Sequence, residues 1–183
     1  MTTAIALIRG INVGRAKRIA MAELRDLVAA LGHKKVRTVL NSGNVIFETS
    51  RSANDKIAQE IQAAIEHECS VSASVLVITD KTLADIITEH PLRDLADDPA
   101  KLLVAFVSDR GVLAKTSALT KQAWAPDALA VGTHAAYVWC ANGVLESKAL
   151  QAFTRLTGTA ATTRNWATVL KLQAAASAAP LPP

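Results

Sequence analysis

The chain has 183 residues, half of them hydrophobic and a fifth charged, which excludes an intrinsically disordered chain and allows one large domain or two small ones. Its longest early apolar run, residues 4–8, is too short for a membrane span or a signal-peptide core, so we expect a cytoplasmic protein. The formal net charge is +4, and the positive charge lies in residues 1–40, which carry eight basic and two acidic side chains. This bias favours an anionic partner. The alternative is a solvated face whose counter-charges come from elsewhere in the fold.

In chain order, the first half predicts a strand, a helix, two strands joined by a hairpin, a helix, a strand and a helix. Apolar residues at helical spacing, such as Leu24, Leu27, Val28 and Leu31, indicate the helices, and alternating apolar and polar residues indicate the strands. The expected strands are residues 4–9, 35–40, 45–48 and 71–78. The expected helices are residues 21–31, a second that follows an Asn54-Asp55 cap and contains Ile57, Ile61 and Ile65, and a third that follows a Thr79-Asp80 cap and ends before Pro91.

The second half repeats this order after a segment, residues 91–100, that is rich in proline and acidic residues and is typical of a linker. Strands are expected at residues 102–107, 128–131, 136–140 and 160–163, and helices at residues 113–123, 145–156 and 165–175. The last residues, 177–183, are rich in alanine and proline and are expected to fray.

This repeated order predicts an α+β fold of two tandem ferredoxin-like subdomains, each β-α-β-β-α-β plus a helix. The expected boundaries are residues 1–90 for the N-terminal subdomain, 91–100 for the linker and 101–176 for the C-terminal subdomain. The prediction rests on element order alone, because the residues of the two halves do not align.

A loop with the sequence Arg9-Gly10-Ile11-Asn12-Val13-Gly14 follows the first expected strand, and Asn41-Ser42-Gly43-Asn44 forms the first hairpin turn. In a ferredoxin-like sheet the third strand runs antiparallel beside the first. The end of the first strand therefore lies next to the start of the third, and the two loops are expected to meet at one edge of the sheet.

The residues of these two loops suit an anionic or polar planar ligand. Glycine allows positive φ and close approach of backbone N–H groups, an arginine fork pairs with phosphate or carboxylate, and an amide both donates and accepts hydrogen bonds. The spacing of Gly10 and Gly14 matches neither a P-loop nor a dinucleotide fingerprint, so the alternative is a turn that merely requires glycine. The candidate ligand-binding residues are Arg9, Gly10, Asn12, Gly14, Asn41, Ser42, Gly43 and Asn44.

Four stretches of this chain resemble one family of small bacterial proteins, the domain of unknown function 1697 family. They are residues 6–14, 21–25, 36–47 and 163–172. The resemblance implies an α+β fold of two similar subdomains and supplies no catalytic residue. Arg15 stands where the family often has a glycine or a small polar residue, which adds charge to the first loop and can hold the backbone further from a ligand.

Arg164 and Asn165 repeat the chemistry of the first loop at the start of the last expected helix. Asn165 is a good N-cap, which is the simpler interpretation. The functional alternative is that the last helix returns to the first subdomain and brings Arg164 to the same ligand site.

We hypothesise that the protein binds a nucleotide or a phosphorylated metabolite at the first loop and the adjoining hairpin. One alternative is single-stranded nucleic-acid binding, with Phe47, Tyr137 and Trp139 as a thin stacking platform. Another is an enzyme of unknown reaction, with His134 as a general base and Asp109 assisting. A scaffold that pairs with a partner through its sheet edges is a further alternative. No metal is expected: the adjacent His67, Glu68 and Cys69 are more typical of a helix surface.

Overall fold

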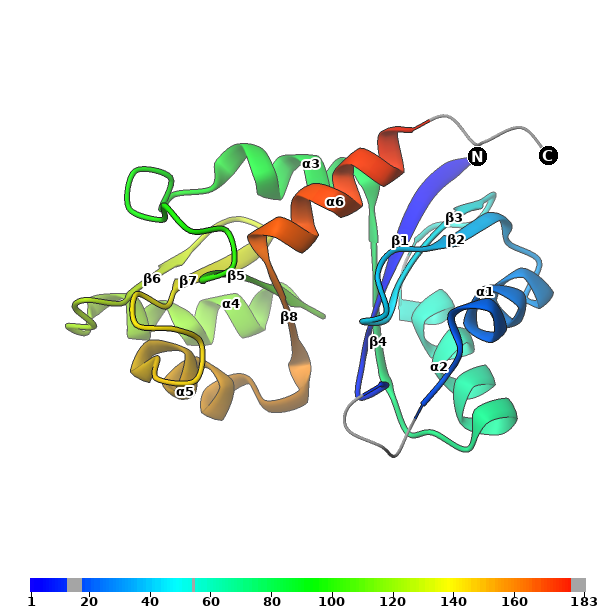
Figure 1. The fold of residues 1–183 in the computed structure, drawn as a ribbon, viewed down its shortest axis with the longest axis horizontal. Helices are drawn as coiled ribbons and strands as arrows, with labels where there is room; N and C mark the ends of the chain where they lie inside the picture. The colour runs from blue at the N-terminus through cyan, green and yellow to red at the C-terminus, as the bar shows by residue number, and fades with distance from the viewer. Residues whose placement is uncertain (13–17, 54, 179–183) are drawn as a thin grey trace. The chain divides into compact units, whose positions relative to one another are not determined.

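The structure, a computed structural model, describes residues 1–12, 18–53 and 55–178 (Figure 1). The chain divides into two compact units. The first unit comprises Met1–Lys81 and Lys171–Pro183, and the second comprises Thr82–Leu170. Each has a four-stranded antiparallel sheet and its own hydrophobic core, so the protein is α+β.

The first unit begins with β1 (Thr2–Arg9), α1 (Met21–Ala30), β2 (Lys34–Thr38), β3 (Asn44–Thr49), α2 (Asp55–Cys69) and β4 (Ser74–Thr79), and α3 (Asp80–Glu89) follows. The strand order in the sheet is β2-β3-β1-β4. Strand β1 is central and pairs antiparallel with both neighbours, so that Leu7 lies opposite Asn44 on β3 and opposite Leu76 on β4. The expected adjacency of the first and third strands is therefore confirmed.

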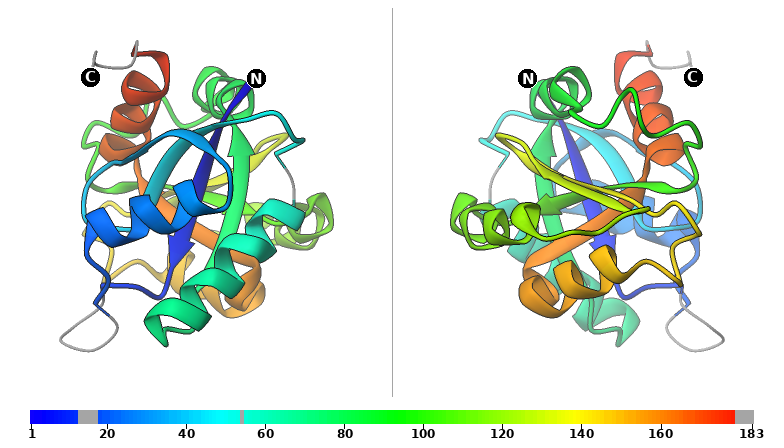
Figure 2. Two further views of the ribbon diagram at one scale, coloured as in Figure 1. Left: turned by 90° about the vertical axis from the view of Figure 1, so that its right-hand side faces the viewer. Right: turned by 90° about the vertical axis from the view of Figure 1, so that its left-hand side faces the viewer.

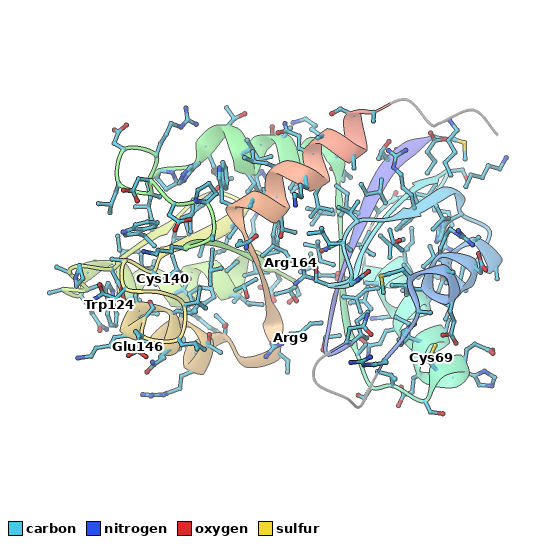
Figure 3. All side chains as sticks on the ribbon, viewed as in Figure 1. Arg9, Cys69, Trp124, Cys140, Glu146 and Arg164 are labelled. Atoms are coloured by element: carbon cyan, nitrogen blue, oxygen red, sulfur yellow. The ribbon has the colours of Figure 1, made fainter. Side chains whose placement is uncertain are left out.

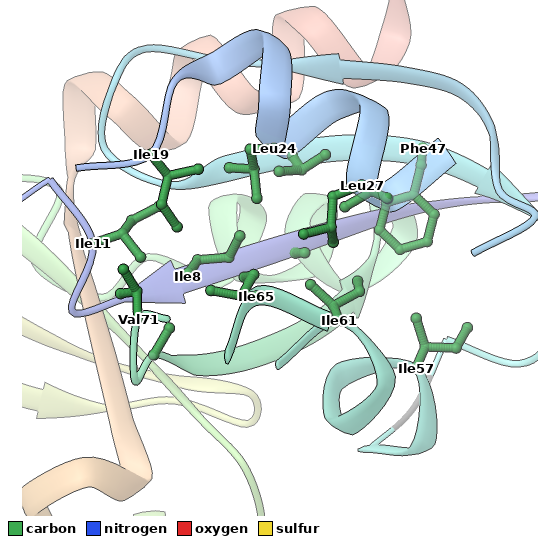
Figure 4. Close-up of a cluster of buried hydrophobic side chains, with 14 of the residues drawn as sticks. Ile8, Ile11, Ile19, Leu24, Leu27, Phe47, Ile57, Ile61, Ile65 and Val71 are labelled. Carbon is green, nitrogen blue, oxygen red and sulfur yellow. The ribbon is translucent and has the colours of Figure 1, made fainter. Parts of the chain in front are cut away.

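Helices α1 and α2 cover one face of this sheet (Figure 2). Their apolar stripes, Leu24, Leu27 and Val28 on α1 and Ile57, Ile61 and Ile65 on α2, pack against alternate residues of β1 and β3, among them Ile8 and Phe47 (Figure 4). Ile11 and Ile19 extend the same core beyond the end of β1. The loop between β1 and α1 is therefore anchored in the core near both of its ends.

The second unit contains β5 (Leu102–Val107), α4 (Arg110–Thr116), β6 (Ala128–Val131), β7 (Ala135–Trp139), α5 (Lys148–Thr157) and β8 (Ala161–Asn165), followed by α6 (Trp166–Ser177). Its strand order is β6-β7-β5-β8, with β5 central. Alternate residues of β5 and β7, including Ala105 and Val138, form the core with Leu113 of α4 and Phe153 of α5.

The expected elements are present, with different limits at several ends. The helix expected at residues 113–123 is α4 followed by a 3₁₀ turn, Ser117–Lys121. It begins earlier than expected because Asp109 is its N-cap: the Asp109 Oδ1 accepts hydrogen bonds from the Gly111 and Val112 N–H groups. The helix expected at residues 145–156 begins only at Lys148, since Ser147 is its N-cap and accepts from the Leu150 N–H. The strand expected at residues 71–78 begins at Ser74. The expected cap Asn54 and the tail residues 179–183 lie outside the described residues.

The division into compact units differs from the boundaries expected at residues 90 and 101. It falls inside α3, between Lys81 and Thr82, and inside α6, between Leu170 and Lys171. Near the end of α6 the Arg37 guanidinium, from β2, donates a hydrogen bond to the Ala175 carbonyl. This bond ties the C-terminal part of α6 to the first unit.

Among the residues described, no helix has the length and the apolar character needed to span a membrane.

Candidate functional site

The first loop and the hairpin meet at one edge of the first sheet, as the strand order requires. The Ile8 N–H donates to the Gly43 carbonyl over 2.7 Å, and the paired positions Leu7 and Asn44 bring the end of β1 beside the start of β3. The hairpin turn at residues 41–43 is thus hydrogen-bonded to the end of β1, just before the loop.

Gly43 makes this close approach possible. Its φ is +75°, and a Cβ at this position would lie 2.7 Å from the Ile8 carbonyl oxygen and 3.1 Å from the Ile11 Cδ1. Any other residue would force the hairpin away from β1, because a Cβ cannot approach backbone oxygen so closely. A conformational requirement therefore accounts for this glycine.

Two asparagine side chains hold the loops in place. Asn44 is fully buried, and its Nδ2 donates to the Val39 carbonyl and to the Ser42 Oγ, which fixes the turn. Asn12, at φ +56°, donates from Nδ2 to the carbonyls of Ile19 and Asn41 and accepts from the Ile19 N–H. The Asn12 amide therefore joins both ends of the loop to the hairpin.

A cavity of about 540 Å³ opens beside these contacts. It is lined by Asn12, Arg18, Ile19, Ala20, Met21 and Asn41. Arg18 and Asn41 are exposed, and Met21 is half-buried. We call this space the loop cavity.

The N-terminus of α1 forms one wall of the loop cavity. Its N-cap residue is Ala20, in extended conformation, and no side chain among the described residues caps the helix. The first N–H groups of a helix have no partner within the helix, and an alanine cannot supply one. The loop cavity therefore combines a guanidinium, an amide and the positive end of a helix dipole, all of which attract an anion.

Neither Arg18 nor Ala20 is among the ligand-binding residues predicted from the sequence, although each has a signal there. Arg18 belongs to the basic stretch of residues 1–40. Ala20 directly precedes the helix that begins at Met21, at a position where serine, threonine, aspartate or asparagine ordinarily caps a helix.

The other candidates of the first unit have different surroundings. Arg9 is exposed at the end of β1 (Figure 3), in register with Ser74 of β4. It is not among the residues that line the loop cavity. Gly10 has φ +89°, and a Cβ there would lie 3.4 Å from the Ser72 carbonyl oxygen. Gly14 lies outside the described residues.

Arg164 and Asn165 belong to β8 in the second unit. The Asn165 Oδ1 accepts a hydrogen bond from the Thr168 N–H over 2.9 Å, so Asn165 caps α6. Arg164 lies opposite Val104 on β5 and donates to the Thr163 carbonyl. Burial lowers the pKa of the Arg164 guanidinium to about 10.

The residues suggested for an enzyme have structural contacts. The His134 N–H donates to the Glu89 carboxylate, which also accepts from the Thr133 N–H and the Tyr137 hydroxyl. Burial alone would raise the pKa of Glu89, but these hydrogen bonds outweigh it and hold the pKa below its ordinary value. Asp109 caps α4. Glu89 thus fastens the end of α3 to the hairpin between β6 and β7.

Neither cysteine is an activated nucleophile. Burial raises the pKa of the Cys140 thiol, and burial together with the Glu23 carboxylate raises the pKa of the Cys69 thiol. Because the thiolate is the reactive form, both thiols are poor nucleophiles at neutral pH. Within the described part of the chain, no three His, Cys, Asp or Glu side chains group as metal ligands would.

The aromatic residues considered for base stacking are engaged inside their own units. Phe47 is fully buried in the first core, where its ring lies 4.5 Å from that of His33. The Tyr137 hydroxyl donates to the Ile86 carbonyl over 2.6 Å, and burial raises its pKa. Trp139 is 6% exposed. A stacking platform needs exposed ring faces, and these residues do not supply them.

Comparisons with known proteins agree with this fold. The family model described as "Protein of unknown function (DUF1697)" matches residues 1–137, which confirms the resemblance found in the sequence. A solved structure, that of the conserved bacterial protein SP0830 from Streptococcus pneumoniae, is similar at a TM-score of 0.78 and 20% identity, covering 96% of this chain and 99% of that one. At this identity the likeness shows the fold alone. The comparison with curated proteins gave no match.

Proposed function

We propose that this chain, which belongs to the DUF1697 family of proteins of unknown function, binds an anionic small molecule, a nucleotide or a phosphorylated metabolite, in the loop cavity. One observation carries the proposal: the N-terminus of α1, whose N-cap residue Ala20 has no capping side chain, lines the same cavity as Arg18 and Asn41. A cavity of about 540 Å³ falls within the range of ordinary small-molecule sites, about 300–1,000 Å³.

The chemistry of the walls supports a phosphate rather than a neutral ligand. Helix N–H groups point along the axis toward the ligand and carry partial positive charge, and a guanidinium adds a full charge with a forked donor. Asn41 supplies an amide for a second polar group of the ligand.

The candidate residues then take two kinds of role. Asn41 contacts the ligand directly, together with Arg18. Asn12, Gly43 and Asn44 hold the hairpin against the loop and shape the cavity. Ser42 supports Asn44 through its Oγ.

Arg9 and Gly10 flank the site at the end of β1, and Arg9 contributes charge to this edge of the sheet. The proposed site is confined to the first unit and does not include Arg164 or Asn165.

We further propose that each unit is a ferredoxin-like subdomain and that the chain arose by duplication. The support is that the strand orders β2-β3-β1-β4 and β6-β7-β5-β8 correspond position by position. A cytoplasmic location is also proposed, and the two free cysteines support it because thiols persist in a reducing compartment.

Isothermal titration calorimetry with inorganic phosphate, AMP and glucose 6-phosphate tests the binding proposal. Arg18→Ala is expected to weaken binding about tenfold or more, because a charge-assisted hydrogen bond contributes about 1.5–3 kcal/mol. Arg25→Ala is the matched control: Arg25 is an exposed arginine on α1, paired with Asp26 and away from the cavity lining. Binding that is equally affected by the two substitutions, or absent for every probe, would refute the proposal.

A further inference from the structure

A second, larger cavity lies along α1, and it adjoins the loop cavity. It has a volume of about 790 Å³ and is formed in the first unit by residues of α1 and α2, with Ala20 before α1 and Leu31 after it. Its lining residues are Ala20, Ala22, Glu23, Asp26, Leu27, Ala30, Leu31, Ala64 and Glu68. Ala20 also lines the loop cavity, so both spaces border the start of α1. We call this second space the acidic groove.

The acidic groove has a chemistry opposite to that of the loop cavity. Among its described lining residues, the side chains able to form hydrogen bonds are three carboxylates, Glu23, Asp26 and Glu68, and all other side chains are apolar. Ionised carboxylates only accept hydrogen bonds. An occupant of the groove must therefore present an apolar body and hydrogen-bond donors.

The three carboxylates keep capacity for a ligand despite their local contacts. Glu23 accepts from the Cys69 thiol at 3.7 Å, Asp26 pairs with Arg25 on the same helix, and Glu68 contacts His67. Each contact uses one oxygen, whereas a carboxylate offers about four acceptor positions.

The two cavities together define the polarity of one elongated ligand. The loop cavity offers a guanidinium and helix N–H groups, which require an anion, and the groove offers apolar surface and acceptors, which require donors. Because Ala20 borders both spaces, a ligand long enough to extend along this residue would contact both.

We propose that the natural ligand carries a phosphate at one end, bound in the loop cavity, and an apolar body with an amino group at the other, bound in the acidic groove. This inference rests on the proposed function, because it places the phosphate in the same site. Two sources of this chemistry exist: a nucleotide whose base has an exocyclic amine, and an aminoalkyl phosphate.

Two pairs of probes test the inference by calorimetry with the full chain. AMP and IMP differ by an amino group against a carbonyl on the base, and 6-aminohexyl phosphate and hexyl phosphate differ by the terminal amine. We expect at least one amino member to bind about threefold or more tightly than its partner, and both members of that pair to bind more tightly than inorganic phosphate. The pair that shows the preference identifies the source.

Two matched substitutions locate the effect. Glu68→Gln is expected to reduce the amine preference, while Glu66→Gln, an exposed glutamate on the same helix outside the groove lining, leaves it unchanged. Ala64→Gln, which fills the groove, is expected to weaken the longer probes without changing inorganic phosphate binding, whereas Ala63→Gln on the exposed side of α2 has no effect. Circular dichroism verifies that each variant is folded.

The outcomes separate this inference from the proposed function. Inorganic phosphate that binds with no amine preference in either pair overturns the inference and leaves the proposed function standing. An amine preference that survives both Glu68→Gln and Ala64→Gln also overturns it. Failure of inorganic phosphate and of all four probes to bind refutes the proposed function itself.

Discussion

The missing cap of α1 gives the most discriminating prediction. Ala20 occupies the N-cap position in extended conformation, φ −67° and ψ 142°, which a capping residue adopts without strain. Ala20→Asp places a carboxylate over the first N–H groups of α1, at the point where we propose that the ligand anion binds. The substitution is expected to stabilise the protein and weaken anion binding at the same time.

The size of both effects follows from the geometry. Replacing alanine by a capping residue stabilises a helix by about 1 kcal/mol, within about 0.5–2 kcal/mol, which corresponds to a rise in Tm of about 2–4 °C for a chain of this length. A unit charge about 4 Å from the ligand anion repels it by about 1 kcal/mol in water and by about 4 kcal/mol near a protein surface. The dissociation constant should therefore rise between about fivefold and about a thousandfold.

Ala20→Ser separates the charge from the cap. The hydroxyl also accepts a hydrogen bond from the first turn but carries no charge, so we expect a similar gain in Tm with a much smaller loss of affinity. Differential scanning calorimetry gives the Tm, and titration with inorganic phosphate gives the affinity. If Ala20→Asp binds phosphate as tightly as the unmodified chain, the anion does not bind at the start of α1 and the reasoning is wrong.

Three further predictions concern stability, measured by urea unfolding. Gly43→Ala should lower the free energy of unfolding by about 2–4 kcal/mol, because of the positive φ and the clash with the Ile8 carbonyl of β1. Gly32→Ala is the control: Gly32 also has positive φ, but nothing lies within 4 Å of an added Cβ, so the loss should be only about 1–2 kcal/mol. Equal losses would show that the close approach of Gly43 to β1 is unimportant. Tyr137→Phe should cost about 1–3 kcal/mol because it removes the hydroxyl donor to the Ile86 carbonyl of α3 and one of the donors to the Glu89 carboxylate. A neutral result would contradict the role given to this hydroxyl. Burial and the nearby Arg51 lower the pKa of His33 in the folded protein. As the pH falls below 6.5, the unfolded chain therefore takes up a proton at His33 before the folded protein does, and the free energy of unfolding should decrease. His33→Leu should make the free energy of unfolding less dependent on pH, and an unchanged slope would exclude His33 as the source of this dependence.

The strand order was predictable because each strand and helix has a regular apolar pattern in this chain. The spacing of Leu24, Leu27 and Val28 and that of Ile57, Ile61 and Ile65 mark the two helices that cover the first sheet. Element order then restricts the sheet to few topologies, and the adjacency of the first and third strands follows from it.

Element ends were less predictable, because single side chains decide them. Asp109 starts α4 and Ser147 starts α5, each through a hydrogen bond to a backbone N–H near the start of its helix. The spacing of apolar residues does not show which side chain forms such a bond. The division inside α3 and α6 was also hidden, since a helix continues past a unit boundary without any change in its pattern.

The meeting of the first loop and the hairpin was predictable, but the hydrogen-bond partners of their asparagine side chains were not. Sequence composition drew attention to Asn12 and Asn44 as ligand contacts, but a side-chain amide is equally suited to bonding backbone carbonyls of its own chain. In this fold both Nδ2 groups donate to such carbonyls. The choice between these partners depends on tertiary geometry, which a linear pattern does not contain.

The internal bonds of Asn12 and Asn44 have a consequence for binding. Because they fix the hairpin and both described ends of the loop within the protein itself, the walls of the loop cavity at Asn41 and Ile19 are in place without help from a ligand. A site whose walls are already ordered loses little conformational entropy when it binds, so more of the interaction energy appears as affinity. Changes at Asn12 should therefore weaken binding although its amide need not contact the ligand, whereas changes at Arg18 should weaken binding without lowering stability. Comparing the loss of affinity with the loss of stability for each substitution therefore distinguishes the residues that build the cavity from those that bind the anion.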